Sequence, residues 1–179
     1  MKDVEVEIRS FISKNKYEYM LEFFKEKGKF INEDEQVTYY FDCDEDLRIQ
    51  KNNFFSKIWL KKGKIHDDFR KEIEIKFGKD HFDNLASLFS TLGYNIKVKW
   101  FRKRHTFEWQ GIDVAVDYTR GYGYILELEK KVGEEEKRKT LEYLKDKLKE
   151  LEIELTPKEE FNNKYEHYLK NWEKLIFKE

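Results

Sequence analysis

The chain has 179 residues, 41% of them charged, and its 36 Lys and Arg against 37 Asp and Glu give a formal net charge of −1. This balance argues against a DNA or RNA partner held by bulk positive charge, and an aromatic content of 17% argues against disorder. No apolar run approaches the roughly 20 residues that cross a membrane, and the N-terminus lacks an apolar signal segment, so we expect no membrane partner and a cytoplasmic location.

The first half of the chain reads as one helix among several strands. Residues 3–12 alternate apolar and charged side chains, which predicts a strand. The apolar stripe of 14–27 predicts a helix that ends at Gly28. Further strands are expected at 30–42, 47–51, 55–62 and 69–77.

The second half adds three helices and three strands. A stripe of Leu85, Leu88, Phe89 and Leu92 predicts a helix over 80–92. The remaining expected elements are strands at 95–107, 112–118 and 122–131, an amphipathic helix within 134–152, and a last helix opened by a capping box at Thr156-Pro157-Lys158-Glu159. Many strands with few helices indicate an α+β fold built on a largely antiparallel sheet or barrel.

No Pro-, Gly- or Ser-rich linker divides the sequence. We therefore expect a single domain over 1–179, with the sheet and its covering helices in 1–155 and a C-terminal helix in 156–179.

Charged residues recur on single faces of the predicted strands. At 69–77, for example, Arg70, Glu72, Glu74 and Lys76 alternate with apolar side chains. A sheet with one solvated face explains any one such strand. If the apolar faces of all the strands instead lie outward beneath amphipathic helices, the charged faces line the interior of a barrel, where basic and acidic groups converge.

Such an interior needs ligands, metal and water to offset the desolvation of its charges. Converging Arg and Lys suit the oxygens of a polyphosphate. Carboxylates at i and i+2 on one strand face, as in Glu5/Glu7 and Glu127/Glu129, can share a Mg²⁺ or Mn²⁺ ion. The residues thus predict a polyphosphate held through a divalent cation, which would polarise a phosphoryl group.

Seven segments resemble, in chain order, motifs of the CYTH domain family, the triphosphate tunnel metalloenzymes. The first, Glu5-Val6-Glu7-Ile8-Arg9, resembles the family's E-x-E-x-K signature. The others, each with the motif it resembles, are residues 36–42 (D-x-Y-Y-D), 47–50 (L-R-I-R), 60–63 (a basic strand with a following glycine), 70–74 (R-x-E-x-E), 102–107 (K-x-R-x-x-Y) and 116–129 (D…G-x-F-x-E-x-E). The resemblance covers about residues 1–155.

The resemblance implies an eight-stranded antiparallel β-barrel with a polar interior, a tunnel that binds a triphosphate lengthwise with Mg²⁺ or Mn²⁺. Members include class IV adenylyl cyclases, thiamine triphosphatases, inorganic triphosphatases and RNA triphosphatases. By position, the implied metal ligands are Glu5, Glu7, Asp117, Glu127 and Glu129. The implied triphosphate-binding residues are Arg9, Arg48, Lys61, Arg70, Arg102 and Arg104. The implied catalytic residues are Arg9, Glu72 and Glu74.

Two positions depart from the family motifs. Arg9 stands for the signature lysine, which keeps the charge and changes its geometry, and Gln50 stands for the second arginine of L-R-I-R, which removes a phosphate contact. Three functions are therefore weighed: an enzyme that cyclises ATP or hydrolyses a triphosphate, a non-catalytic nucleotide- or polyphosphate-binding module, and a structural barrel. ATP, thiamine triphosphate and tripolyphosphate share the part that the charges contact, so the sequence does not choose among them.

Three smaller expectations follow from composition and pattern. The single cysteine, Cys43, excludes an internal disulfide or a Cys-based zinc site. Abundant Lys and Glu with few Gln favour a thermophilic source. The aromatic face of the last helix packs either on the barrel or against a second subunit in a homodimer; it is formed by Phe161, Tyr165, Tyr168 and Trp172.

Overall fold

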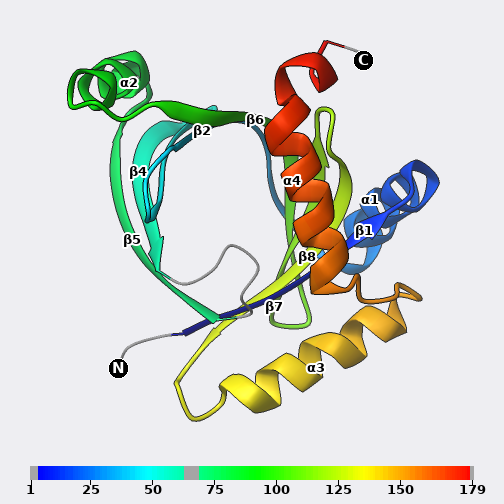
Figure 1. Ribbon diagram of the computed structural model, residues 1–179. Helices are drawn as coiled ribbons and strands as arrows, with labels where there is room; N and C mark the ends of the chain where they lie inside the picture. Colours follow the sequence, from blue (N-terminus) through cyan, green and yellow to red (C-terminus); the bar gives the residue numbers. More distant parts are fainter. Residues whose placement is uncertain (1–3, 63–68, 178–179) are drawn as a thin grey trace.

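The structure, a computed structural model, describes residues 4–62 and 69–177, with the backbone alone at 62 and 69–72. Figure 1 shows the strands curving around to form a barrel, with the helices outside it. The strands are β1 (Val4–Ile12), β2 (Lys29–Phe41), β3 (Asp46–Lys51), β4 (Phe55–Lys62), β5 (Phe69–Gly78), β6 (Ile96–Trp109), β7 (Ile112–Thr119) and β8 (Gly123–Val132). The helices are α1 (Lys14–Lys27), the 3₁₀ helix η1 (Lys79–His81), α2 (Phe82–Thr91), α3 (Lys137–Glu150) and α4 (Lys158–Leu175). None of the described helices is both long and apolar enough to span a membrane.

The strands pair antiparallel in the order β1-β5-β4-β3-β2-β6-β7-β8, which closes into a barrel. β1 pairs with β8 along its whole length, whereas its junction with β5 has, among residues 4–62 and 69–177, two paired positions, Glu5 opposite Arg70 and Val6 opposite Phe69. The predicted α+β fold with an eight-stranded antiparallel barrel is confirmed.

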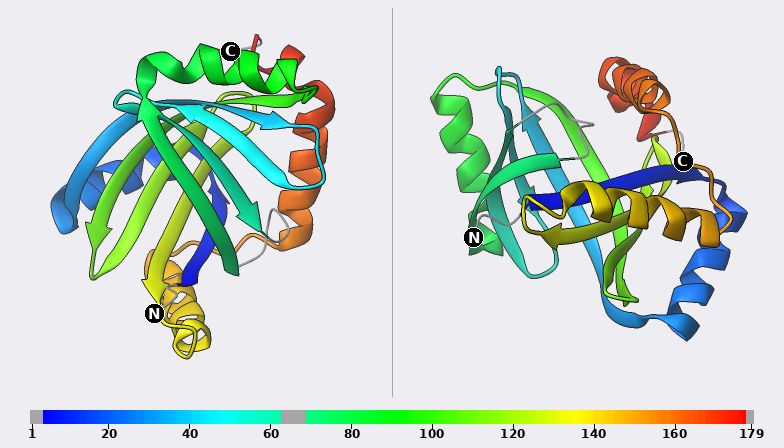
Figure 2. Two further views of the ribbon diagram at one scale, coloured as in Figure 1. Left: turned by 90° about the vertical axis from the view of Figure 1, so that its left-hand side faces the viewer. Right: turned by 90° about the horizontal axis from the view of Figure 1, so that it is seen from below.

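The apolar faces of the strands point outward, as the alternating pattern predicted, and helices cover much of them, although Ile73 and Ile75 of β5 are 53% and 54% exposed. α1 and α3 lie over the side of the barrel formed by β1 and β6–β8, and α2 lies over the opposite side (Figures 1 and 2). On the first side, Met20 and Phe24 of α1 and Leu144 of α3 are fully buried. On the second side, Phe82 and Leu85 of α2 are buried. The interior is thereby left to the charged faces.

Helix α2 is shorter and less covered than its stripe predicted. It begins at Phe82, after the 3₁₀ turn, and its N-cap residue makes no side-chain capping hydrogen bond. Leu85 is buried, but the side chains of Leu88 and Leu92 are 51% and 63% exposed. The helix has ten residues, with Phe82 and Leu85 buried and Phe89 partly buried against the barrel, so only part of the stripe packs.

Helix α4 packs on the barrel through its aromatic face. Tyr168 is buried against Val98 and Trp100, and its hydroxyl donates to the carbonyl of Lys99 at 3.1 Å. The predicted capping box is wrong because Thr156 serves β1 instead. Its Oγ1 accepts from the Phe11 amide at 2.9 Å, and no side chain caps the helix.

Candidate functional site

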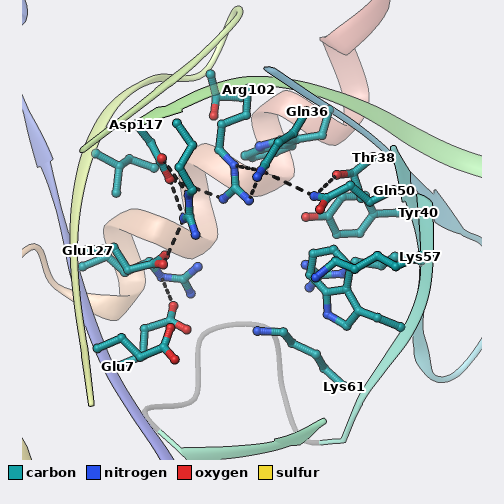
Figure 3. Close-up of a pocket in the computed structure, with 18 of the residues that line it drawn as sticks. Glu7, Gln36, Thr38, Tyr40, Gln50, Lys57, Lys61, Arg102, Asp117 and Glu127 are labelled. Atoms are coloured by element: carbon teal, nitrogen blue, oxygen red, sulfur yellow. Dashed lines mark hydrogen bonds and ion pairs between the residues drawn. The ribbon is translucent and has the colours of Figure 1, made fainter. Parts of the chain in front are cut away.

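The inward faces of the strands enclose a cavity of about 380 Å³. Side chains from all eight strands and from α4 line it, and most of them are charged or aromatic. Figure 3 shows Glu7, Glu127 and Asp117 along one wall and Lys57 and Lys61 on the wall opposite. The predicted convergence of charged strand faces inside a barrel is therefore observed.

Three carboxylates meet at the junction of β1 and β8. One oxygen from each of Glu5, Glu7 and Glu129 lies within 4.8 Å of the other two, because Glu7 and Glu129 are paired across the two strands. Burial raises the pKa of Glu129 to about 8, with Glu5, Glu127 and Glu7 adding to the rise. Burial, together with Glu127, also raises the pKa of Glu7.

The chemistry of this donor set fits a divalent cation. Clustered carboxylate oxygens are the ligands that Mg²⁺ and Mn²⁺ prefer, and burial together with the neighbouring carboxylates Glu5, Glu127 and Glu7 raises the pKa of Glu129. A bound dication would supply positive charge and allow all three groups to ionise.

Two partly buried arginines of β6, Arg102 and Arg104, lie beside this cluster. Arg104 donates to both oxygens of Asp117, at 2.9 and 2.6 Å, and to Glu127 at 2.9 Å. Arg102 donates twice to Gln36 Oε1, at 2.9 and 2.6 Å, and more weakly to Asp117 at 3.3 Å. These contacts fix both guanidinium groups at the cavity wall.

Electrostatics distinguishes the groups of this network. Burial opposes the ionisation of Glu127, but Arg104, Arg102 and Arg9 outweigh it and lower its pKa to about 2. Burial lowers the pKa of Arg102, and the nearby charge of Arg104 adds to this effect. Arg104 is also partly buried, yet Asp117 and Glu127 hold its pKa well above the usual value. Glu127 therefore stays ionised at neutral pH, whereas Glu129 readily takes up a proton.

The wall formed by β3 and β4 is basic. Arg48, Lys57 and Lys61 surround the indole ring of Trp59, at 5.0, 4.0 and 5.7 Å from its centroid. Arg48 donates to both oxygens of Asp46 at 2.6 and 2.5 Å. Lys61 also lies 3.8 Å from Glu5, which links this wall to the carboxylate cluster.

Aromatic side chains line the part of the cavity beside α4. Phe161 of α4 stacks on Phe11 of β1, with ring centroids 4.4 Å apart. The guanidinium of Arg9 lies 5.4 Å above the ring of Phe161, and Tyr165 of the same helix also lines the cavity. The C-terminal helix is thus part of the cavity wall.

Residues 3–161 match the family model described as the CYTH domain. The chain belongs to the CYTH family. A Methanocaldococcus jannaschii protein named "Putative adenylate cyclase MJ0240" is 35% identical over 166 residues, which cover 84% of this chain and 90% of that protein. The family resemblance read from the motifs is confirmed.

Solved structures share the CYTH fold. The PH1819 protein of Pyrococcus horikoshii has a TM-score of 0.74 at 24% identity, covering 84% of this chain and 92% of that one. A Hippeastrum protein, described as a putative adenylyl cyclase that reveals a dominant triphosphatase activity, has a TM-score of 0.61 at 18% identity, covering 85% and 89%.

The structure brings most of the predicted CYTH site residues into one cavity. Those that line it are Glu5, Glu7, Arg9, Arg48, Lys61, Glu74, Arg102, Arg104, Asp117, Glu127 and Glu129. The side chains of Arg70 and Glu72 lie outside the described residues. Their backbone positions are opposite Glu5 and Lys61 in the ladders of β5. The roles assigned to all these residues remain predictions.

Three of these side chains contact groups other than those that their predicted roles require. Asp117 was assigned to the metal, but both of its oxygens accept from arginines. Arg48 was assigned to phosphate, but it is held by Asp46. Glu74 was assigned to catalysis, but its two oxygens lie 2.6 and 3.2 Å from Lys57 and Lys76, which lowers its pKa against the opposing effect of burial.

Several cavity residues were not identified as site residues from the sequence. Lys57 and Trp59 share the inward face of β4 with Lys61, so the same alternation could have identified them. Gln36 lies on the inward face of β2 with Thr38 and Tyr40, so alternation places it there too, whereas Asp46 does not line the cavity. Their importance comes from contacts with Arg102 and Arg48, and a sequence pattern does not show which polar groups touch.

Proposed function

We propose that this protein is a divalent-metal-dependent enzyme that binds a triphosphate-bearing small molecule in its tunnel and acts on a phosphorus atom of it. One observation carries the proposal: a cluster of three carboxylates lies within the same cavity as Arg9, Arg102, Arg104 and Lys61. The relatives named as an adenylate cyclase and as a protein with triphosphatase activity support the same substrate class.

Contacts between cations and carboxylates suggest how the site would load. Arg9 lies 3.4 Å from Glu7, and Lys61 lies 3.8 Å from Glu5. Mg²⁺ or Mn²⁺ held by Glu5, Glu7 and Glu129 would neutralise charge on the phosphate oxygens and polarise the phosphoryl group. With those carboxylates satisfied, Arg9 and Lys61 can turn their charge toward phosphate.

The protein residues then bind and orient the chain of phosphates. Arg102 and Arg104 are fixed by Gln36, Asp117 and Glu127, so little side-chain entropy is lost when they meet an anion. Phosphoryl chemistry depends mainly on positioning and on stabilising negative charge. A fixed array of cations inside a closed barrel supplies both.

Two reactions use this arrangement. In an adenylyl cyclase reaction, the 3′-hydroxyl of ATP attacks the α-phosphorus and pyrophosphate leaves. In a triphosphatase reaction, water attacks the terminal phosphorus, the bond to the bridging oxygen breaks, the diphosphate part of the substrate leaves, and orthophosphate forms. The two differ in which phosphorus faces the nucleophile, so a measurement of products must distinguish them.

A substrate panel tests the proposal. The purified protein is given ATP, thiamine triphosphate or tripolyphosphate with Mg²⁺ or Mn²⁺, and cyclic AMP, phosphate and pyrophosphate are measured separately. We expect metal-dependent turnover of at least one substrate, and a loss of a hundredfold or more in Glu129→Gln. Glu150→Gln, on the exposed side of α3, is the matched control and should retain full activity.

A non-catalytic binding module is the second candidate. Gln50 favours it, because this buried amide takes the position of a motif arginine and donates to Thr38 at 2.9 Å. Binding of tripolyphosphate without turnover of any substrate would select this module. Absence of both binding and turnover would contradict both candidates.

A further inference from the structure

Trp59 carries a buried hydrogen-bond donor that no described residue satisfies. Its side chain lines the cavity and Trp59 is 6% exposed, yet Nε1 has no hydrogen-bond partner among the described residues. An indole nitrogen donates and cannot accept. Burying such a donor without a partner costs about 1–3 kcal/mol. Less than 1 Å² of Nε1 is accessible, so an acceptor in the adjoining cavity reaches it when the ring or a flanking side chain turns.

The surroundings of Trp59 decide which acceptor fits. The ring is flanked by three cations, Arg48, Lys57 and Lys61, within 5.7 Å of its centroid. Each cation also faces a carboxylate: Arg48 contacts Asp46, Lys57 contacts Glu74, and Lys61 lies 3.8 Å from Glu5. An anionic oxygen beside the ring can take the indole hydrogen and share the lysine ammonium groups with these carboxylates, which a neutral acceptor does less well. Among groups that reach a tunnel of this kind, a phosphate oxygen has this chemistry.

A second buried polar atom without a hydrogen-bond partner in the described structure also belongs to a residue that lines the cavity. Thr119 Oγ1 is the second buried side-chain polar atom without a partner in the described part of the chain, and Thr119 also lines the cavity. It lies on β7, four strands from β4 in either direction around the barrel. The unsatisfied atoms are therefore on opposing walls of one site and not scattered through the core.

We propose that Trp59 is a phosphate-binding residue of the tunnel, whose indole N–H donates to a phosphate oxygen between Lys57 and Lys61. This inference rests on the proposed function, since it names a contact within the same substrate site. The ring also positions the two ammonium groups, through cation–π contact. Trp59 is absent from the residues that the sequence assigned to phosphate.

The substitution Trp59→Phe removes the N–H and keeps an aromatic ring for the lysines. Binding of tripolyphosphate in the presence of Mg²⁺ should weaken about tenfold, as for the loss of one hydrogen bond to a charged group. Trp109→Phe is the matched control, because Trp109 is buried outside the cavity beneath α1. Its affinity should equal that of the wild type.

Tripolyphosphate and ATP distinguish the two possible acceptors. Tripolyphosphate has no organic group. If the indole hydrogen contacts phosphate, Trp59→Phe should therefore reduce the affinities for tripolyphosphate and for ATP by the same factor. If the acceptor belongs to the nucleoside, only ATP is affected and the proposal is overturned. Wild-type protein that binds neither ligand would contradict the proposed function itself, which separates the two failures.

A direct observation of the indole hydrogen avoids dependence on how well the variant folds. The chain has four tryptophans, so the indole ¹⁵N–¹H spectrum of the wild type has four signals, and the signal missing in Trp59→Phe assigns Trp59. Saturating tripolyphosphate should move this signal downfield and leave that of Trp109 in place. An unmoved Trp59 signal at saturation would show that no ligand oxygen reaches the donor, and would overturn the proposal.

Discussion

Asp117 holds Arg104 through two hydrogen bonds, one to each carboxylate oxygen, at 2.9 and 2.6 Å. Asp117 is 2% exposed, and Arg102 reaches the second oxygen at 3.3 Å. A carboxylate whose two oxygens both face guanidinium groups has little capacity left for a cation. The geometry therefore favours Asp117 as a residue that positions the arginines, in contrast to the metal ligand expected from the motif.

Substitution of Asp117 by Asn tests this distinction. Asp117→Asn removes the carboxylate charge that two partly buried arginines share, so the free energy of unfolding should fall by about 3 kcal/mol in urea titrations. The affinity of the protein for Mn²⁺, measured calorimetrically without substrate, should stay within about twofold if Asp117 positions arginines. Asp146→Asn, on the exposed surface of α3, controls for the chemical change. A large loss of Mn²⁺ affinity with little loss of stability would return Asp117 to the metal.

The position of each charged side chain relative to the barrel was predictable, because alternation assigns every strand residue to one face. Glu5, Glu7, Glu127 and Glu129 were found this way, and the ladder between β1 and β8 then places Glu7 opposite Glu129. The fold followed from the same pattern, since apolar outer faces require covering helices.

The pairing of polar groups was not predictable. Gln36 holds Arg102 across the ladder between β2 and β6, strands separated by three others in the chain. Alternation gives a face but neither a register between distant strands nor a rotamer. The contact between Arg48 and Asp46 was unpredictable for the same reason, because its hydrogen bonds depend on the rotamers of both side chains.

Gln50 and Thr38 offer a test of the departure from the L-R-I-R motif. Gln50 is 3% exposed, and its amide donates to Thr38 Oγ1 at 2.9 Å. Gln50→Arg alone would bury a third cation near Arg102, so we expect a loss of about 3 kcal/mol in the free energy of unfolding. Because Thr38 lies directly opposite, Thr38→Asp should restore stability when combined with Gln50→Arg.

A double-mutant cycle on these two positions measures the recovery. The coupling energy between Gln50→Arg and Thr38→Asp should exceed about 1 kcal/mol, since each charge compensates for the other. Additive losses in the double variant would show that the two side chains do not meet. If the arginine at position 50 also strengthens tripolyphosphate binding in the double variant, Gln50 accounts for a missing phosphate contact.

The raised pKa of Glu129 predicts that the metal-free protein becomes less stable as the pH rises. This pKa is about 8 in the folded chain, because of burial and the neighbouring Glu5, Glu127 and Glu7, against an ordinary value of 4.5. Between these values the folded state binds more protons than the unfolded state. The free energy of unfolding should therefore fall as pH rises from about 4.5 to 8, by up to about 1.4 kcal/mol per pH unit.

The contribution of Glu129 is isolated by difference. Urea titrations at several pH values, with a chelator present, compare the wild type with Glu129→Gln, which should lack this part of the slope. Adding Mg²⁺ or Mn²⁺ should stabilise the wild type more at pH 8 than at pH 5, because protons compete with the metal. Parallel slopes in the two proteins would contradict the assigned pKa.

Gly121 places the turn between β7 and β8 directly against the end of α4. Its φ is +71°, and a Cβ there would lie 2.7 Å from Leu175 Cβ and 3.0 Å from the Leu175 carbonyl carbon. Gly121→Ala therefore combines backbone strain with a clash that must displace the helix. Gly93 has a φ of +90° with nothing within 4 Å of the added carbon, so Gly93→Ala carries the strain alone.

The two alanine variants separate these effects. Gly93→Ala should reduce the free energy of unfolding by about 1 kcal/mol, and Gly121→Ala by about 2 kcal/mol more, because overpacking adds to the strain. Hydrogen exchange should accelerate in 158–175 for Gly121→Ala only. Since Phe161 and Tyr165 of α4 line the cavity, displacement of the helix should also weaken tripolyphosphate binding. Equal losses of stability and unchanged exchange in α4 would show that the helix end yields without affecting the tunnel.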